Sequence, residues 1–232
     1  AEGVELSGNA TGNRVSGNTI HDNVTEIDWN DPTKGGGVGV AFMHSWGPAM
    51  ANGNKLWHNR APLKDGTYDG SNFEVFGASD LTFTNNTAYA ASTQPGWTAG
   101  LLIACGANSL IAYNKLDGFD TAAISVVYNK DYRYQGSLDG LRITTNILTS
   151  NGKQLYHLEN VPASVSIDHD LLWSNGGYLA YVAGRGATGD LGVLQGWTGF
   201  ERSGLIGDPG YLDRNGHNYN LPLWSLWFSL VG

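Results

Sequence analysis

Short apolar runs alternate with polar turns along the whole chain. Each run has the length of a β-strand and is bounded by Gly, Asn, Asp or Ser, which are typical turn residues. No stretch has the 3.6-residue apolar period of an amphipathic helix. The pattern therefore predicts an all-β chain built from many short strands. The runs are VEL (4–6), VGVAF (38–42), FEVF (73–76), GLLIA (100–104), AISVV (123–127), QLYHL (154–158) and YLAYV (178–182).

A polar marker residue recurs between these runs, in segments such as GNTIHDN (17–23) and GNKLWHN (53–59). Successive markers are 36, 32, 28, 32 and 24 residues apart. This repeat predicts a solenoid, and we interpret it as a single-stranded parallel β-helix of about six to seven rungs. Stacked Asn side chains would then bond the rungs on either side. The markers are Asn18, Asn54, Asn86, Asn114, Asn146 and Asp170.

The repeats also resemble a known family. The runs GNRVSGNTIHDN, GNKLWHN and DGLRITTNILTSNG are similar to the right-handed parallel β-helix repeats of the pectate-lyase-like superfamily. Residues 190–222, with a Trp-containing stretch followed by DPGY, resemble the C-terminal end of bacterial secreted β-helix proteins. The resemblance implies a right-handed coil and a secreted, extracellular or periplasmic location. It does not choose among the lyases, hydrolases, epimerases and adhesins of this superfamily.

The sequence leads to different predictions for the N-terminal and C-terminal ends of the solenoid. We expect residues 1–232 to form one β-helix domain, with residues 190–232 as an irregular closing segment. The chain enters its first repeat at Val4, which leaves no room for an N-terminal cap, although solenoids need one. The chain is therefore expected to lack N-terminal coils of a longer product, or to associate through the uncapped end.

Composition narrows the partners. The formal net charge is −8 and only 15% of residues are charged, which argues against nucleic acid or an anionic membrane as a partner. It also disfavours a polyanionic substrate unless cations bridge it. The single cysteine, Cys105, excludes an internal disulfide and a Cys-based zinc site. No apolar run reaches transmembrane length.

The rung spacing suits chemistry on polysaccharides. Adjacent rungs are about 4.8 Å apart, so carboxylates one or two rungs apart bracket the separations used by glycosidases. Side chains alternate along a strand, so Phe73 and Val75 should point inward and Glu74 outward. Asp69 lies in the turn before that strand. Glu74 is therefore a candidate acid or base, with Asp69 or Asp120 as its partner.

The segment DGFD (117–120) is the one rung in which acids break the repeat. This makes Asp120 a candidate catalytic residue, although Asp-Gly is also simply a good turn dipeptide. Asp117 and Asp120 together can supply oxygen ligands to Ca²⁺. No other cofactor is expected.

Several polar and aromatic residues follow the long apolar runs and should line one edge of the groove. We interpret them as substrate-binding candidates, because a polysaccharide needs hydrogen-bond partners and flat aromatic surfaces. For each residue, a purely structural role in its loop is the alternative. The candidates are His44, Trp46, Tyr128, Glu159 and Arg185, together with the loop residue Trp97.

Other clusters are rejected as sites. Asp168, His169 and Asp170 look like metal ligands, but Asp170 occupies the marker position of the repeat. His21 and His58 lie in the repeat turns, away from the strand-end candidates. No nucleophile elbow, phosphate loop, dinucleotide fingerprint or zinc-protease motif is present.

Three functions remain. The favoured hypothesis is a glycoside hydrolase that acts on an extended, neutral or weakly charged polysaccharide through paired carboxylates. The second is a polysaccharide lyase that uses a base and bound Ca²⁺ for β-elimination. The third is a non-catalytic surface or adhesin module that binds glycans, for which binding without product formation is the discriminating result.

Overall fold

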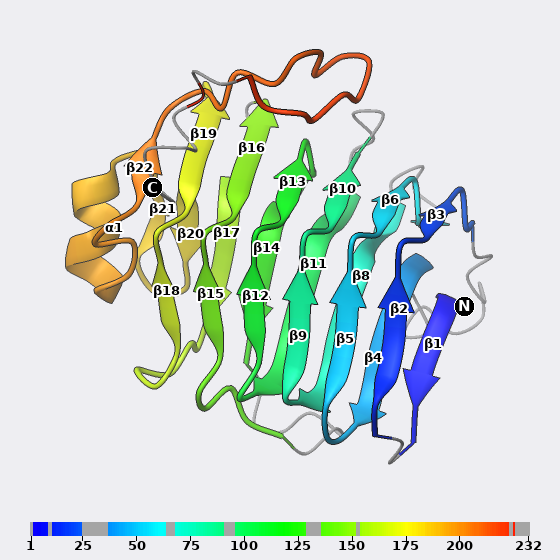
Figure 1. The fold of residues 1–232 in the computed structure, drawn as a ribbon. Coiled ribbons are helices and arrows are strands. Elements are labelled where there is room, and N and C mark those ends of the chain that lie inside the picture. The colour runs from blue at the N-terminus through cyan, green and yellow to red at the C-terminus, as the bar shows by residue number, and fades with distance from the viewer. Residues whose placement is uncertain are drawn as a thin grey trace.

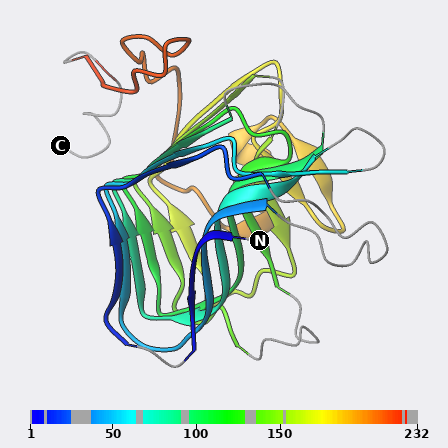
Figure 2. The same cartoon turned by 90° about the vertical axis from the view of Figure 1, so that its right-hand side faces the viewer.

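The structure is a computed structural model that describes residues 2–8, 11–24, 37–63, 68–90, 96–128, 136–151, 154–222 and 225. The chain coils into a solenoid whose wall consists of three parallel sheets (Figures 1 and 2). Each rung contributes one strand to each sheet in turn. The all-β parallel β-helix predicted from the repeat is therefore confirmed.

The first sheet, called the long sheet, contains the longest strands and has nine strands in the described residues. Its order is β1 (Glu2–Ser7), β4 (Gly37–Ser45), β8 (Tyr68–Ser79), β11 (Gly96–Ala107), β14 (Ala122–Val127), β17 (Gln154–Glu159), β20 (Ala180–Val182) and β21 (Gly186–Thr188). The short strand β7 (Ala61–Pro62) pairs with β8 in antiparallel orientation.

Two narrower sheets complete the wall. The six-stranded sheet contains β2 (Asn13–Ser16), β5 (Ala49–Asn52), β9 (Leu81–Thr84), β12 (Leu110–Ala112), β15 (Arg142–Thr144) and β18 (Ser166–Asp168). The seven-stranded sheet contains β3 (Thr19–His21), β6 (Lys55–Trp57), β10 (Thr87–Tyr89), β13 (Lys115–Asp117), β16 (Ile147–Asn151), β19 (Leu171–Asn175) and β22 (Leu205–Ile206).

The marker residues form a buried ladder at the turn between the two narrower sheets. Nδ2 of Asn54 donates to Oδ1 of Asn86 at 2.9 Å, and Nδ2 of Asn86 donates to Oδ1 of Asn114 at 3.0 Å. Ladder amides also donate to a backbone carbonyl of the preceding rung; Nδ2 of Asn114, for example, donates to the Phe83 carbonyl. The six ladder positions therefore span about five turns of the solenoid, close to the predicted rung count.

Apolar side chains fill the inside of the coil, as the alternation predicted. Phe73 and Val75 of β8 are fully buried in the core, and Phe73 meets Phe83 edge-on at 4.5 Å between ring centroids. Burying one such side chain stabilises the fold by about 1.5–3 kcal/mol. Because every rung adds the same inward positions, the core is one continuous column.

The C-terminal end departs from the repeat. The strands β20 and β21 pair in antiparallel orientation, and α1 (Leu191–Thr198) follows them at the end of the solenoid (Figure 1). Asp190 caps the helix by accepting a hydrogen bond from the Val193 amide, and Leu194 is buried in the core. The expectation of no helix was wrong here, because an eight-residue helix is too short to show a clear apolar period. Within the described residues, no helix is long and apolar enough to cross a bilayer.

Candidate active site

The outer face of the long sheet carries a transverse row of side chains set by the strand register. Glu74 lies in this row, as alternation predicted, but several of its neighbours are buried, including Ala41, Leu102 and Ser125. Glu74 itself is half-buried. The centre of this face is therefore mostly covered. The row consists of Glu5, Ala41, Glu74, Leu102, Ser125, His157 and Tyr181.

A second transverse row lies where the strands of the long sheet begin, and it contains two predicted catalytic residues. Asp69 of β8 is the register partner of Trp97 on β11. On the other side of β11, Asp120 lies just before β14, and its hydrogen bonds to Gly96 and Thr98 hold it beside Trp97. We call Asp69, Trp97 and Asp120 the carboxylate row.

The two acids of the carboxylate row have different environments. Asp69 is half-buried, and desolvation raises the pKa of its carboxyl group. The Asp120 carboxylate accepts a hydrogen bond from the Gly96 amide at 2.7 Å, and its own amide donates to the Thr98 hydroxyl at 3.1 Å. Trp97 between them is 37% exposed. The row thus combines an acid with a raised pKa, an oriented carboxylate and an accessible indole.

Glu74 does not share a site with these acids. It lies five residues beyond Asp69 along β8, and five residues of a strand span roughly 16 Å. The hypothesis that Glu74 and Asp120 act as a pair therefore lacks the proximity that it needs. Asp69, which sequence analysis offered as an alternative partner, is the acid that lies in the same row as Asp120.

The predicted substrate-binding residues at the ends of the long strands gather at the opposite edge of the sheet. His44 has a left-handed backbone conformation with φ of 53°, and Arg185 is exposed in a turn after β20. Trp46 packs close to Gly136, and Tyr128 packs against the core. These residues are separated from the carboxylate row by most of the width of the sheet.

Glu159 belongs to a polar cluster that sequence reasoning missed. Its Oε1 lies 2.6 Å from Nε2 of His157, whose Nδ1 lies 3.0 Å from Nε2 of Gln154. The His157 ring stacks on Tyr181. Both imidazole nitrogens are engaged, so this histidine does not activate the neighbouring buried Ser125 hydroxyl, which has no hydrogen-bond partner among the described residues. Alternation along QLYHL was the signal that places His157 outward.

Asp117, one of the two acids proposed to bind Ca²⁺, already has other partners. Arg214 of the C-terminal segment binds the Asp117 carboxylate, and its guanidinium packs over Trp173. Tyr219 also donates to Asp117 at 2.9 Å, and Thr149 donates at 2.6 Å. A guanidinium therefore neutralises the carboxylate that Ca²⁺ was expected to use. Among the described residues, no group of three or more His, Cys, Asp or Glu side chains is arranged to hold a metal ion.

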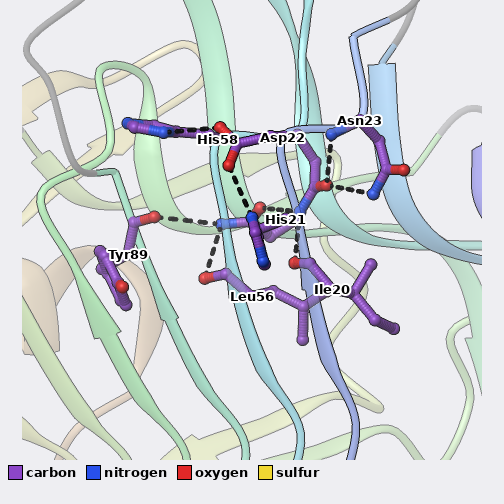
Figure 3. A network of polar contacts seen from close by, with 9 residues as sticks. Ile20, His21, Asp22, Asn23, Leu56, His58 and Tyr89 are labelled. Atoms are coloured by element: carbon purple, nitrogen blue, oxygen red, sulfur yellow. Dashed lines mark hydrogen bonds and ion pairs between the residues drawn. The ribbon is translucent and has the colours of Figure 1, made fainter.

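The histidines of the first two repeat turns also form a contact that the sequence analysis did not foresee. Asp22 bridges two rungs, with Oδ2 at 2.6 Å from Nδ1 of His21 and Oδ1 at 3.0 Å from Nδ1 of His58 (Figure 3). The hydrogen bond from His21 is the main cause that lowers the pKa of Asp22. Beside this bridge runs a second amide ladder, in which Asn23 donates to Asn59 at 2.7 Å. Asp22 therefore links the turns of two neighbouring rungs.

Comparison with known families agrees with this architecture. Residues 1–137, more than half of the chain, match a family described as right handed beta helix region. The protein is thus a right-handed parallel β-helix, and the chain belongs to this family. The resemblance to pectate-lyase-like repeats is accordingly confirmed at the level of the fold. No curated protein and no solved structure matches the chain significantly.

Proposed function

We propose that the protein is a glycoside hydrolase that cleaves an extended polysaccharide at the carboxylate row. The observation that carries the proposal is that Asp69 pairs with the exposed Trp97 on one side, while Asp120 is hydrogen-bonded to Gly96 and Thr98, the two neighbours of Trp97, on the other. Two strand spacings separate the two acids by about 9.6 Å. This is just above the range of about 6.5–9.5 Å between the carboxyl groups of inverting glycosidases, a difference that small side-chain rotations can close.

The roles follow from the environment of each acid. Burial raises the pKa of Asp69, so this residue is suited to hold a proton and donate it to the glycosidic oxygen as the sugar bond breaks. Asp120, oriented by the Gly96 amide, is suited to take a proton from the water that attacks the anomeric carbon. Trp97 offers its ring as a stacking surface for a sugar.

The charge of the protein supports a neutral or weakly charged substrate. With a net charge of −8, an acidic polysaccharide would be repelled at long range. β-Elimination on a uronate is further disfavoured because Asp117, one of the two acids expected to hold Ca²⁺, forms an ion pair with Arg214. We also propose that the protein acts outside the cytoplasm, as its resemblance to secreted bacterial β-helix proteins implies.

The test is a polysaccharide panel assayed for both reducing ends and unsaturated products. Asp69→Asn and Asp120→Asn should each lower kcat by about 10²–10⁴-fold on the substrate found, and Trp97→Ala should mainly raise KM. The anomeric proton of the first product should show inversion. Asp80→Asn, which removes a charge at an exposed turn, is the matched control and should keep full activity.

Glu74→Gln separates this proposal from the alternative pairing, because it should leave kcat nearly unchanged. Full activity in both Asn variants would refute the assignment of the carboxylate row. An unsaturated product would indicate a lyase, and glycan binding without any product would indicate a binding module.

A further inference from the structure

A groove on the seven-stranded sheet concentrates positive charge in this acidic protein. The C-terminal segment, which runs back over β16, β13 and β10 in Figure 1, forms one wall of the groove. Its volume is about 220 Å³. We call it the lysine groove, and its lining residues are Lys55, Thr87, Lys115, His217, Asn218, Tyr219 and Asn220.

The two lysines are placed by the register of the repeat. Thr87 pairs with Lys55 on one side and with Lys115 on the other, so the lysines are two rungs apart, or about 9.6 Å. Nζ of Lys115 donates to the Tyr219 carbonyl at 2.8 Å. Nζ of Lys55 lies 5.5 Å from the ring centroids of both Trp57 and Tyr89.

The positive charge of the lysine groove is not compensated by an acid. Within the part of the chain that the structure describes, no carboxylate forms an ion pair with Lys55 or Lys115. The acid of this sheet, Asp117, is already paired with Arg214. Burial lowers the pKa of Lys115, as expected for an ammonium group that loses water without gaining a carboxylate.

The other lining groups suit hydroxyls. Thr87 offers a hydroxyl, and Asn218 and Asn220 are exposed and offer amides that both donate and accept. The volume is below the range of about 300–1,000 Å³ typical of pockets for drug-sized ligands. The occupant that fits is thus small, anionic and hydroxyl-bearing.

We propose that the lysine groove binds a sugar acid, a single ring with one carboxylate, through Lys55 and Lys115. The carboxylate lies between the two ammonium groups, and Thr87 and the asparagine amides bind ring hydroxyls. This site is on a different sheet from the carboxylate row, and it does not depend on the proposed hydrolase activity.

Titration of the full chain with glucuronate, glucose and sulfate tests the proposal, by calorimetry or by amide NMR shifts. Glucuronate should bind, its affinity should fall with added salt, and glucose should not bind detectably. Lys55→Gln should weaken glucuronate binding at least about ten-fold, since charged hydrogen bonds of this kind are worth that much. Arg142→Gln removes an exposed positive charge on the six-stranded sheet and should change nothing.

Within the described residues, Lys55 forms no hydrogen bond to the C-terminal segment, so Lys55→Gln should keep its circular dichroism spectrum. Lys115→Gln provides the second variant. Equal glucuronate affinity in the wild type and both variants would overturn the proposal, as would no binding at all. Sulfate binding as tightly as glucuronate would overturn the assignment to a sugar. Asp69→Asn should leave glucuronate affinity unchanged, so failure here is distinguishable from failure of the proposed hydrolase.

Discussion

The last ladder position carries an acid in place of an amide, and this difference has a measurable cost. Asp170 is fully buried, and its Oδ1 accepts the Asn146 amide at 3.0 Å. Tyr156 donates to the Asp170 carboxylate and lies 2.9 Å from Oε1 of Glu201. Burial raises the pKa of Asp170 to about 6, and burial together with the charge of Asp170 raises the pKa of Glu201 well above its usual value.

The sign of the pH dependence follows from linkage. The folded chain holds the Asp170 proton more tightly than the unfolded chain does, so the stability from this group is fully present below about pH 4. It is lost as the pH rises towards 6, where folded Asp170 ionises. A pKa raised by about two units corresponds to roughly 3 kcal/mol.

Asp170→Asn should remove this loss. The new amide keeps Oδ1, which Asn146 needs, and its Nδ2 replaces the oxygen that accepts from Tyr156. That amide can donate to the Tyr156 oxygen, while the Tyr156 hydroxyl donates to Glu201. The variant should therefore be more stable than the wild type by up to about 3 kcal/mol above pH 6, with no gain at pH 4. Urea unfolding followed by tryptophan fluorescence between pH 4 and 8 measures the difference.

Asp80→Asn is the matched control for charge, because Asp80 is exposed in a turn and already has a left-handed φ of 56°. It should shift stability by less than about 0.5 kcal/mol at every pH. A gain for Asp170→Asn that is equal at pH 4 and pH 8, or a loss at pH 8, would refute the reasoning.

Three further predictions address the rungs, the tail and the close backbone contacts. Asn114→Ala should lower the free energy of unfolding by at least about 2 kcal/mol, because buried partners on both sides lose hydrogen bonds. Asn18→Ala, at the exposed end of the ladder, should lower it by about 1 kcal/mol or less, and equal losses in urea unfolding would contradict the role of the ladder. Arg214→Ala leaves the buried Asp117 carboxylate without its cationic partner and should weaken docking of the C-terminal segment by about 3 kcal/mol. Limited proteolysis should therefore remove that segment faster than in the wild type. An unchanged cleavage rate would show that this ion pair does not hold the segment in place. Gly37→Ala should destabilise the protein, because its Cβ would overlap the backbone carbonyl of Arg60. In α1, the Cβ of Gly196→Ala meets no neighbouring atom, so this variant should be more stable by about 0.5–1 kcal/mol. The thermal unfolding temperatures of the two variants should move in opposite directions.

The ladder and the core are predictable from the amino-acid sequence because one structural rule recurs in every rung. The marker spacing located the ladder from Asn18 to Asp170, and alternation placed Phe73 inside and Glu74 outside. Alternation did not show which outward residues are accessible. Ser125 points outward in its strand and is nonetheless completely buried, because exposure depends on what packs over the sheet.

The candidate site was only partly predictable for the same reason. Asp69, Trp97 and Asp120 were each singled out from the sequence, but their alignment depends on the exact register of β8, β11 and β14. A shift of one residue between strands would turn one side chain to the other face. The sequence pattern locates strands to within a few residues, which is too coarse to fix that alignment.

The amino-acid sequence by itself determined the solenoid, its ladder and its inward positions, because these depend on contacts between equivalent residues of adjacent rungs. Only the tertiary structure showed which group binds the Asp117 carboxylate, because its partner Arg214 lies 97 residues later in a segment that does not repeat. It also decided that this tail builds a wall of the lysine groove. A periodic pattern carries no information about contacts between the repeat and a non-repeating tail, since those contacts depend on where the chain returns in space.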